Sequence, residues 1–576
     1  MTDMKGKIQV KTKTPYDQKI VLALLPYWTP QLPPMGISCI KTYLKERGFK
    51  HVIGIDANTD MQLRFRYDNY INRLKEIVPL SKQGNFRSIG NDVWQNHMMA
   101  HMNYTNEKEY LELVKTLVWE VFFHDIDNEI AWEFVGYIKD FYVRLEAFVD
   151  DFLEREQPDV LGLSAFIGTL PASVFAAKRA KKKNPDILTV LGGGAFTDQL
   201  GLGSPNLDYF VENSIDYIDK FIIGEGEILF YKLLLGQLCD HQRVFSIRDI
   251  KGEVVDLSSS GIPDIEDFNL EHYLTLGHYA SRSCPFQCNF CSDPVYWGAY
   301  RRKDAQKMVK EFTEMYRRYG YQLFIMTDLL INPLLAALSD ALIESDLSIY
   351  FESTMRISET ACNLENTMKW RRAGFYHAEM GCESGSPRIL QLMNKKITVE
   401  QIRGTITAMA EAGIKTTTYW VIGYPGETEE DFQMTLDLVE ELKDNIYEAM
   451  NNAFWYYQAG PVNNSNWQDK SFPLFTEKQK KMLLLQQWLL DLEPSREIRY
   501  NRVARFVDHI NMLGIPDINR LQDIHNADIR WKRLHKNSVP PILDFDRGSV
   551  YIDENKRLRE FQKVRHKLEH DNQWGF

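Results

Sequence analysis

The chain has 576 residues, with 68 Lys and Arg against 79 Asp and Glu, so its formal net charge is −11. Hydrophobic residues make up 44% and charged residues 26% of the chain, which excludes a disordered, collagen-like or coiled-coil protein. The length predicts two to four domains. The acidic balance favours a small molecule or a peptide as substrate, with neither nucleic acid nor a membrane as partner.

Seven cysteines are scattered through the chain, and three of them lie within eight residues. An odd number at irregular spacing is typical of a reducing compartment and not of a disulfide framework. The N-terminus has no apolar signal region, and no stretch approaches about 18 consecutive apolar residues. We therefore expect a cytoplasmic protein.

Short apolar runs alternate with amphipathic stretches between Lys19 and about Leu235. This alternation predicts an α/β domain over residues 1–250, a doubly wound, Rossmann-like parallel sheet. The expected strands are Ile20–Leu25, His51–Ile55, Asp159–Ser164, Ile187–Leu191 and Lys220–Ile223, with helices at Ile37–Arg47, about Ala172–Lys183 and after Glu227.

Residues 61–157 are too many for a crossover loop and carry aromatic residues at helical spacing. We expect a helical insertion that packs on the sheet, with a role in covering the active site as the alternative.

Glycines and polar residues gather after the expected strands, at the edge where doubly wound sheets bind ligands. No G-x-G-x-x-G follows the first strand, which disfavours ordinary dinucleotide binding. Tight turns are the alternative explanation of these glycines. The candidate ligand-binding residues are Pro34, Gly36, Ser164, Phe166, Gly168, Gly192, Gly193, Gly194, Gly224, Glu225, Gly226 and Glu227.

Cys284, Cys288 and Cys291 form a C-x₃-C-x₂-C triplet. One loop with this spacing can wrap thiolates around a metal centre, and three ligands leave a coordination position open for chemistry. Zinc is the main competitor, but the local sequence offers no fourth Cys or His.

This triplet resembles the signature of the radical S-adenosylmethionine (radical SAM) enzymes, and two further segments extend the likeness. Met380–Ser386 resembles that family's G-x-E-S-G-S segment, and Val421–Thr428 resembles its G-x-P-G-E-T segment near the adenine. The resemblance implies a partial (β/α)₆ barrel over residues 251–465, with a single [4Fe–4S] cluster held by the three cysteines. S-adenosylmethionine (SAM) would bind the fourth iron and yield a 5′-deoxyadenosyl radical.

The resemblance also implies residue roles. Phe290 would shield the cluster and adenine, Glu383 would contact the polar end of SAM, and Ile422 and Gly423 would admit the adenine. Asp328 and Arg356 end expected strands and could line the cavity, with a helix cap and a surface ion pair as the alternatives. The implied SAM-binding residues are Phe290, Arg356, Gly381, Glu383, Ser384, Ile422, Gly423 and Pro425.

A doubly wound domain followed by such a barrel resembles the cobalamin-dependent branch of the family. That resemblance assigns cobalamin to the strand-end residues of the N-terminal domain. No D-x-H-x-x-G motif marks a histidine as the lower ligand of the corrin, and members of this branch commonly lack it.

The implied function is methylation of an unactivated carbon, with SAM used once to methylate cob(I)alamin and once to make the radical. A one-electron reductant such as flavodoxin or ferredoxin would supply the electron. The alternative within the family is a rearrangement, epimerisation or cyclisation without methyl transfer. A non-catalytic iron–sulfur sensor or electron carrier is the alternative of another class, and it has no use for the two SAM segments.

Residues 466–576 match no motif and suggest a mostly helical region that caps the barrel or binds a partner. An amphipathic helix is expected over Thr476–Leu492. Trp488, Trp531 and Trp574 are candidate contacts of this region.

Overall fold

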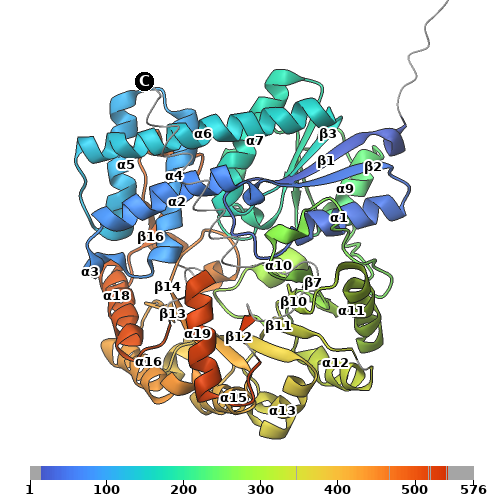
Figure 1. The fold of residues 1–576 in the computed structure, drawn as a ribbon. Coiled ribbons are helices and arrows are strands. Elements are labelled where there is room, and N and C mark those ends of the chain that lie inside the picture. The colour runs from blue at the N-terminus through green and yellow to red at the C-terminus, as the bar shows by residue number, and fades with distance from the viewer. Residues whose placement is uncertain are drawn as a thin grey trace, which may run out of the picture.

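The computed structural model describes residues 14–345, 347–465, 467–516, 518, 521–539 and 541–542. Two parallel sheets form two halves of the molecule (Figure 1), with the N-terminal half at the top and the barrel below it. None of the helices in the described part of the chain is long and apolar enough to cross a membrane. Trp574 and the rest of residues 543–576 lie outside the described residues, so the expectation of a helical region is tested only up to residue 542.

The N-terminal sheet is parallel throughout and has the strand order β2-β1-β3-β4-β5-β6, which confirms the doubly wound prediction. The order reverses between β1 and β3, so the ligand-binding switch point lies there. The sixth strand, β6, was not expected because it has only three residues. The strands are β1 (Lys19–Leu24), β2 (His51–Asp56), β3 (Val160–Ser164), β4 (Leu188–Gly192), β5 (Lys220–Ile223) and β6 (Val244–Ser246).

Strand β1 is buried on both faces, as its continuous apolar run predicts. Ile20 and Leu22 pack into a core shared with the barrel, whereas Val21 and Ala23 pack into a core shared with the insertion. The helices that flank the sheet are α1 (Met35–Glu46), α7 (Leu170–Lys183), α8 (Pro205–Glu212) and α9 (Gly226–Leu234).

The insertion between β2 and β3 is helical and covers one face of the sheet. Its longest helix, α6, runs beside α7 across the top of Figure 1. The inserted helices are α2 (Met61–Ile77), α3 (Leu80–Gln83), α4 (Phe86–Asn103), α5 (Glu107–Phe122) and α6 (Asn128–Glu156).

The second sheet is a six-stranded parallel partial barrel, as the resemblance implies, with the order β14-β13-β12-β11-β10-β7. Its strands are β7 (Leu276–His278), β10 (Leu323–Met326), β11 (Tyr350–Met355), β12 (Phe375–Glu383), β13 (Lys415–Ile422) and β14 (Glu448–Ala453). Its helices are α11 (Ala305–Tyr319), α12 (Asn332–Glu344), α13 (Leu364–Arg372), α14 (Pro387–Leu392), α15 (Val399–Glu411) and α16 (Glu429–Glu441).

The described part of the C-terminal region combines helices with a small antiparallel strand pair. Figure 1 shows α18 and α19, in orange and red, beside the barrel. These elements are β15 (Ser471–Pro473), α17 (Glu477–Leu483), β16 (Trp488–Leu490), α18 (Arg496–Met512) and α19 (Leu521–Leu534).

The prediction of one helix over Thr476–Leu492 is wrong. The helix stops where Leu484 takes a left-handed conformation (φ 57°). The Gln486 side chain then accepts from the Phe475 N–H at 2.8 Å and donates to the Phe475 carbonyl at 2.7 Å. These tertiary bonds favour a turn over another helical turn, and hydrophobic periodicity does not encode them.

A buried group of ion pairs joins the two halves. Arg282, on the short strand β8 (Ser281–Arg282), donates to Glu227 at 2.6 Å and also to Glu225. Arg301, on the paired strand β9 (Arg301–Arg302), lies 3.0 Å from Glu225. The side chains of Arg282, Glu225 and Glu227 are each less than 10% exposed, so this contact fixes the sheet edge against the barrel.

Arg282→Met should destabilise the protein strongly, because it leaves two buried carboxylates without their main counter-charge. We expect the free energy of unfolding in urea to fall by about 3–5 kcal/mol. The control is Lys232→Met, which removes a more exposed ion pair with Glu253 and should cost less than about 1 kcal/mol. Equal losses in both variants would show that the Arg282 group does not join the domains.

Candidate functional site

The cysteine triplet lies on a loop that follows β7, the first strand of the barrel. Asp328, just after β10, fixes the start of this loop by accepting from the Ala280 N–H at 2.9 and 3.2 Å and from the Ser281 hydroxyl. Burial raises the pKa of Asp328 to about 6, against the lowering effect of the Ser281 hydrogen bond. Asp328 therefore supports the start of the cysteine loop.

The far side of the cysteine loop is tied to the segment that follows Met380–Ser386. The Asn289 N–H donates to the Met393 carbonyl at 3.0 Å, and its side chain donates to the Leu392 carbonyl at 2.8 Å. In the opposite direction, the Asn394 side chain donates a hydrogen bond to the Gln287 carbonyl at 2.6 Å. Two segments about 100 residues apart in the sequence are thus held together.

The three thiols are free, with Cys288 buried and Cys284 and Cys291 half-buried. Burial raises the pKa of Cys284 and of Cys291 above the usual thiol range. Among the described residues, no three His, Cys, Asp or Glu side chains are arranged around a single metal ion. Three thiols on one loop are a donor set that can hold a cluster and leave one iron open to a further ligand.

Arg356, which follows β11, lies directly over the cysteine loop. Its Nη1 is 3.7 Å from the Cys288 Sγ, and its guanidinium carbon is 3.8 Å from the centre of the Phe286 ring. Its Nη2 is buried with no hydrogen-bond partner among the described residues. An unpaired buried donor of this kind is costly unless a ligand atom accepts from it.

Glu383 and Lys395 form a buried ion pair beside the same loop, with Lys395 Nζ 2.6 Å from Glu383 Oε1. Burial is the largest single effect on Lys395 and lowers its pKa, but the charge and hydrogen bond of Glu383 together with nearby Cys288 outweigh it, so the net pKa is raised. A Cβ on Gly381 would lie 2.3 Å from Glu383 Oε1, which explains glycine there. Lys395 lies outside the Met380–Ser386 motif, so the motif did not mark it as a site residue.

Ser384 is buried within its own turn, whereas Phe290 lies on the cysteine loop. Ser384 is fully buried inside the turn, where its hydroxyl accepts from the Ser386 N–H at 3.1 Å, so it does not face the loop. Phe290 lies on the cysteine loop, and Lys395 Nζ is 5.9 Å from the centre of its ring.

The Val421–Thr428 loop is held from behind by α18. Gly423 has φ 76°, and its N–H donates to Glu427 Oε2 at 3.0 Å. Arg502 also donates to Glu427 Oε2, at 2.9 Å, while burial raises the pKa of Glu427 to about 7 against the effect of Arg502. A Cβ on Gly423 would lie 2.1 Å from Arg499 Cγ, so the space at Gly423 is taken by the protein itself.

The sequence suggested that Ile422 and Gly423 leave room for the adenine, whereas in the structure Gly423 leaves room for Arg499. Ile422 and Gly423 are both buried, and Pro425 is half-buried on the same loop. The glycine is required for the turn and for the approach of Arg499. The role of α18 had no sequence signal, because the C-terminal region matches no motif.

The twelve residues assigned to cobalamin gather at the carboxyl edge of the N-terminal sheet, but several of their close contacts are with the protein itself. Gly193 has φ 104°, and a Cβ there would lie 2.6 Å from the Ala165 carbonyl oxygen. The carboxylates of Glu225 and Glu227 form ion pairs with Arg282. Their carboxylates therefore join the domains.

Aromatic side chains at the same edge were not expected. Trp28, which is half exposed, stacks on Phe166 with ring centres 4.4 Å apart. The Tyr296 hydroxyl, on α10 (Asp293–Trp297) just after the cysteine loop, donates to the Gly193 carbonyl at 3.0 Å. The sheet edge and the cysteine loop are therefore in direct contact.

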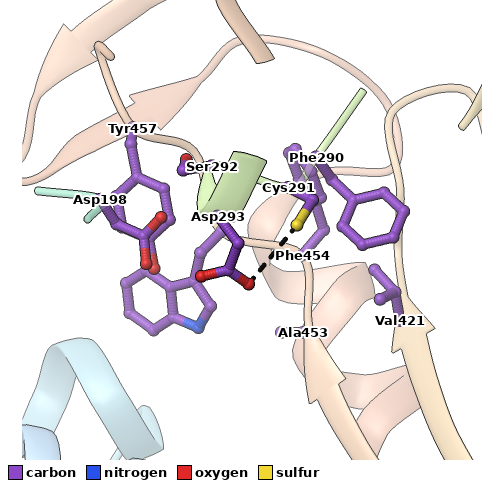
Figure 2. Close-up of a pocket in the computed structure, with 10 residues that line it drawn as sticks. Asp198, Phe290, Cys291, Ser292, Asp293, Val421, Ala453, Phe454 and Tyr457 are labelled. Carbon is purple, nitrogen blue, oxygen red and sulfur yellow. Dashed lines mark hydrogen bonds between the residues drawn. The ribbon is translucent and has the colours of Figure 1, made fainter. Parts of the chain in front are cut away.

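A cavity of about 270 Å³ lies where these parts meet (Figure 2). Cys291 and Phe290 form part of its wall, so it reaches the cysteine loop. Two carboxylates, those of Asp198 and Asp293, lie in this cavity. No pattern in the sequence marked them as site residues, although both are close to motifs in the chain. Phe454, Trp455 and Tyr457 also line the cavity.

Residues 279–439 match the radical SAM superfamily. The anaerobic magnesium-protoporphyrin IX monomethyl ester cyclase of Rubrivivax gelatinosus is 25% identical over 315 residues, which cover 50% of this chain and 54% of that protein. A tRNA-2-methylthio-N(6)-dimethylallyladenosine synthase of Thermoanaerobacter sp. is 25% identical over 355 residues, covering 59% and 70% of the two chains. This chain thus spans only about half the length of the first of these relatives.

Two solved structures resemble almost the whole chain. The radical SAM methyltransferase TsrM from Kitasatospora setae, solved with tryptophan substrate and a SAM analogue, has a TM-score of 0.56 at 13% identity and covers 95% of this chain and 99% of that chain. The cobalamin-dependent radical SAM enzyme OxsB, solved with aqua-cobalamin, has a TM-score of 0.53 at 11% identity, covering 97% and 80%. Residues 279–439 therefore form a radical SAM domain, within a chain whose overall fold is shared with TsrM and OxsB.

Proposed function

We propose that this chain is a cobalamin-dependent radical SAM enzyme that methylates an unactivated carbon of a small molecule or peptide. The observation that carries the proposal is the contact between the two carboxyl edges. Arg282 and Tyr296, which flank the cysteine loop, reach Glu225 and Gly193 of the N-terminal edge. A group bound at that edge therefore lies beside the cysteines.

The described residues fit the proposed cofactors. Cys284, Cys288 and Cys291 would hold the cluster. The unpaired Arg356 Nη2 suits a carboxylate, and the Glu383–Lys395 pair presents both charges to the zwitterionic end of SAM. Trp28 and Phe166 present aromatic surface at the switch point for a corrin.

With a [4Fe–4S] cluster, SAM and cobalamin in place, the chemistry supplied is hydrogen abstraction by a 5′-deoxyadenosyl radical and transfer of a methyl group to carbon. The chain's own residues bind, orient and exclude water. Arg356 and Lys395 would position the charged end of SAM. Arg502 would hold the Val421–Thr428 loop, on the adenine side, through Glu427.

A radical reaction without methyl transfer is the second candidate, and the similarity to the Rubrivivax cyclase favours it. Anaerobic incubation of the reconstituted protein with methyl-deuterated SAM, a one-electron reductant and extract of the source organism separates the two. Mass spectrometry should find a product with a deuterated methyl group. Formation of 5′-deoxyadenosine without a labelled product would favour the second candidate.

The cysteine triplet should be the sole site of iron binding. We expect the reconstituted protein to carry about four irons and four sulfides, and a Cys284, Cys288, Cys291 triple Ala variant to carry none. Cys239→Ala, which changes an exposed cysteine, is the control and should keep the full content. Colorimetric iron and sulfide analysis is the measurement, and iron retained in the triple variant would reveal other ligands.

Arg356→Met should weaken SAM binding because it removes the unpaired donor over the cysteine loop. Loss of a charge-assisted bond predicts an increase in Kd of about tenfold or more, measured by anaerobic calorimetry. The iron content should stay unchanged. Arg403→Met, which removes an exposed pair with Glu441, is the control. An unchanged Kd in Arg356→Met would remove Arg356 from the SAM site.

Arg502→Met should also weaken SAM binding, but through the position of the Val421–Thr428 loop. Without Arg502, the buried Glu427 carboxylate loses its counter-charge, and the Gly423 turn that it supports becomes less ordered. We expect a several-fold rise in Kd, and Arg502→Lys should restore part of the affinity. If Arg502→Met lowered thermal stability yet left Kd unchanged, α18 would have only a structural role.

A further inference from the structure

Two carboxylates face the cavity beside Cys291. Asp198 comes from the N-terminal domain, four residues after Gly194, and Asp293 begins α10, two residues after Cys291. In Figure 2, both carboxylates lie toward the same end of the cavity as Tyr457, whereas Phe290 and Val421 lie toward the other end. The cavity therefore has a charged end and an apolar end.

No positive charge compensates these carboxylates within the described residues. Asp198 accepts from Thr197 at 3.4 Å and from Ser292, and Asp293 Oδ2 lies 3.6 Å from the Cys291 Sγ. None of the ten described residues that line the cavity is Lys, Arg or His. The neighbouring Glu225 and Glu227, by contrast, are fully paired with arginines.

The remaining walls are aromatic. Phe454, Trp455 and Tyr457 follow β14 and line the cavity together with Phe290. Aromatic faces and carboxylates both attract a cation, and they do so most strongly where water is partly excluded. A volume of about 270 Å³ suits part of a small molecule but is far too small for a corrin.

We propose that this cavity binds the substrate and that the substrate carries a cationic nitrogen, such as a protonated amine, held between Asp198 and Asp293 against the aromatic wall. The inference rests on the proposed function, because Cys291 is taken there as a cluster ligand. Anchoring the cation at the charged end leads the apolar remainder of the substrate along the aromatic wall toward Phe290. Asp198 and Asp293 are then specificity-determining residues.

Binding of two matched probes tests this inference without knowledge of the substrate. The anaerobically reconstituted full-length protein, with SAM bound, is titrated with 2-phenylethylamine and with 3-phenylpropionate, which differ mainly in the sign of their charge. We expect the amine to bind and the carboxylate to bind at least about tenfold more weakly. Calorimetry or ligand-detected NMR provides the Kd.

Asp198→Asn and Asp293→Asn should each weaken amine binding about tenfold or more, because each removes one charge of the anchor. Asp208→Asn, at an exposed position on α8, is the control and should bind like wild type. Iron content and SAM affinity are measured in every variant, so that a folding defect is recognised. Asp198→Asn is the decisive variant, since it is far in sequence from the cysteines.

The inference is overturned if both probes bind equally, if neither binds, or if the Asn variants bind the amine like wild type. It is also overturned if hydroxocobalamin displaces the amine competitively, because the cavity would then belong to the corrin site. Failure of the protein to hold a cluster or SAM would contradict the proposed function itself. Loss of amine discrimination in a protein that holds both would contradict only this inference.

Discussion

The buried contact of Arg282 with Glu225 and Glu227 is the interaction on which the site depends. Arg282 lies two residues before Cys284, and the two carboxylates follow the fifth strand of the N-terminal sheet. One guanidinium thereby sets the position of the cysteine loop relative to the sheet edge. A buried group of charges is stable only when every charge is paired. The side chains of this group therefore cannot shift far from their partners.

The cysteine loop is then held from three further directions. Asp328 fixes its start, Asn289 ties it to the end of α14, and Arg356 lies above Cys288. The loop that would hold the adenine is supported in a similar way by Arg502 of α18. Residues outside the recognisable motifs thus do much of the positioning, and α18 of the C-terminal region supports the Val421–Thr428 loop.

Local patterns in the sequence predict much of the fold. The apolar runs of β1 to β5 and the motifs at Cys284–Cys291, Met380–Ser386 and Val421–Thr428 depend on neighbouring residues alone, and they locate both sheets and the cysteine loop. The end of α17 at Leu483 could not be predicted in this way. It depends on Gln486 bonding to Phe475, and that contact forms only in the folded chain.

The same limit applies to the glycines and the cavity. Sequence position assigned Gly193 and Gly423 to ligand contact, yet each is needed for close approach of the protein's own atoms. Asp198 and Asp293 are 95 residues apart and meet only because the two domains are joined, so no local pattern marks them as a pair. The cysteines could be predicted as metal ligands because their close spacing marks a metal centre locally and resembles a family signature.

In the proposed function, a corrin at the N-terminal edge and a cluster on the cysteine loop share one site. Electron paramagnetic resonance of the anaerobically reconstituted chain, loaded with cobalamin and reduced so that both centres are paramagnetic, tests it most directly. We expect the protein to retain a corrin and the two spectra to be broadened or split by mutual coupling. Failure to retain any corrin, or two sharp and independent spectra, would contradict it.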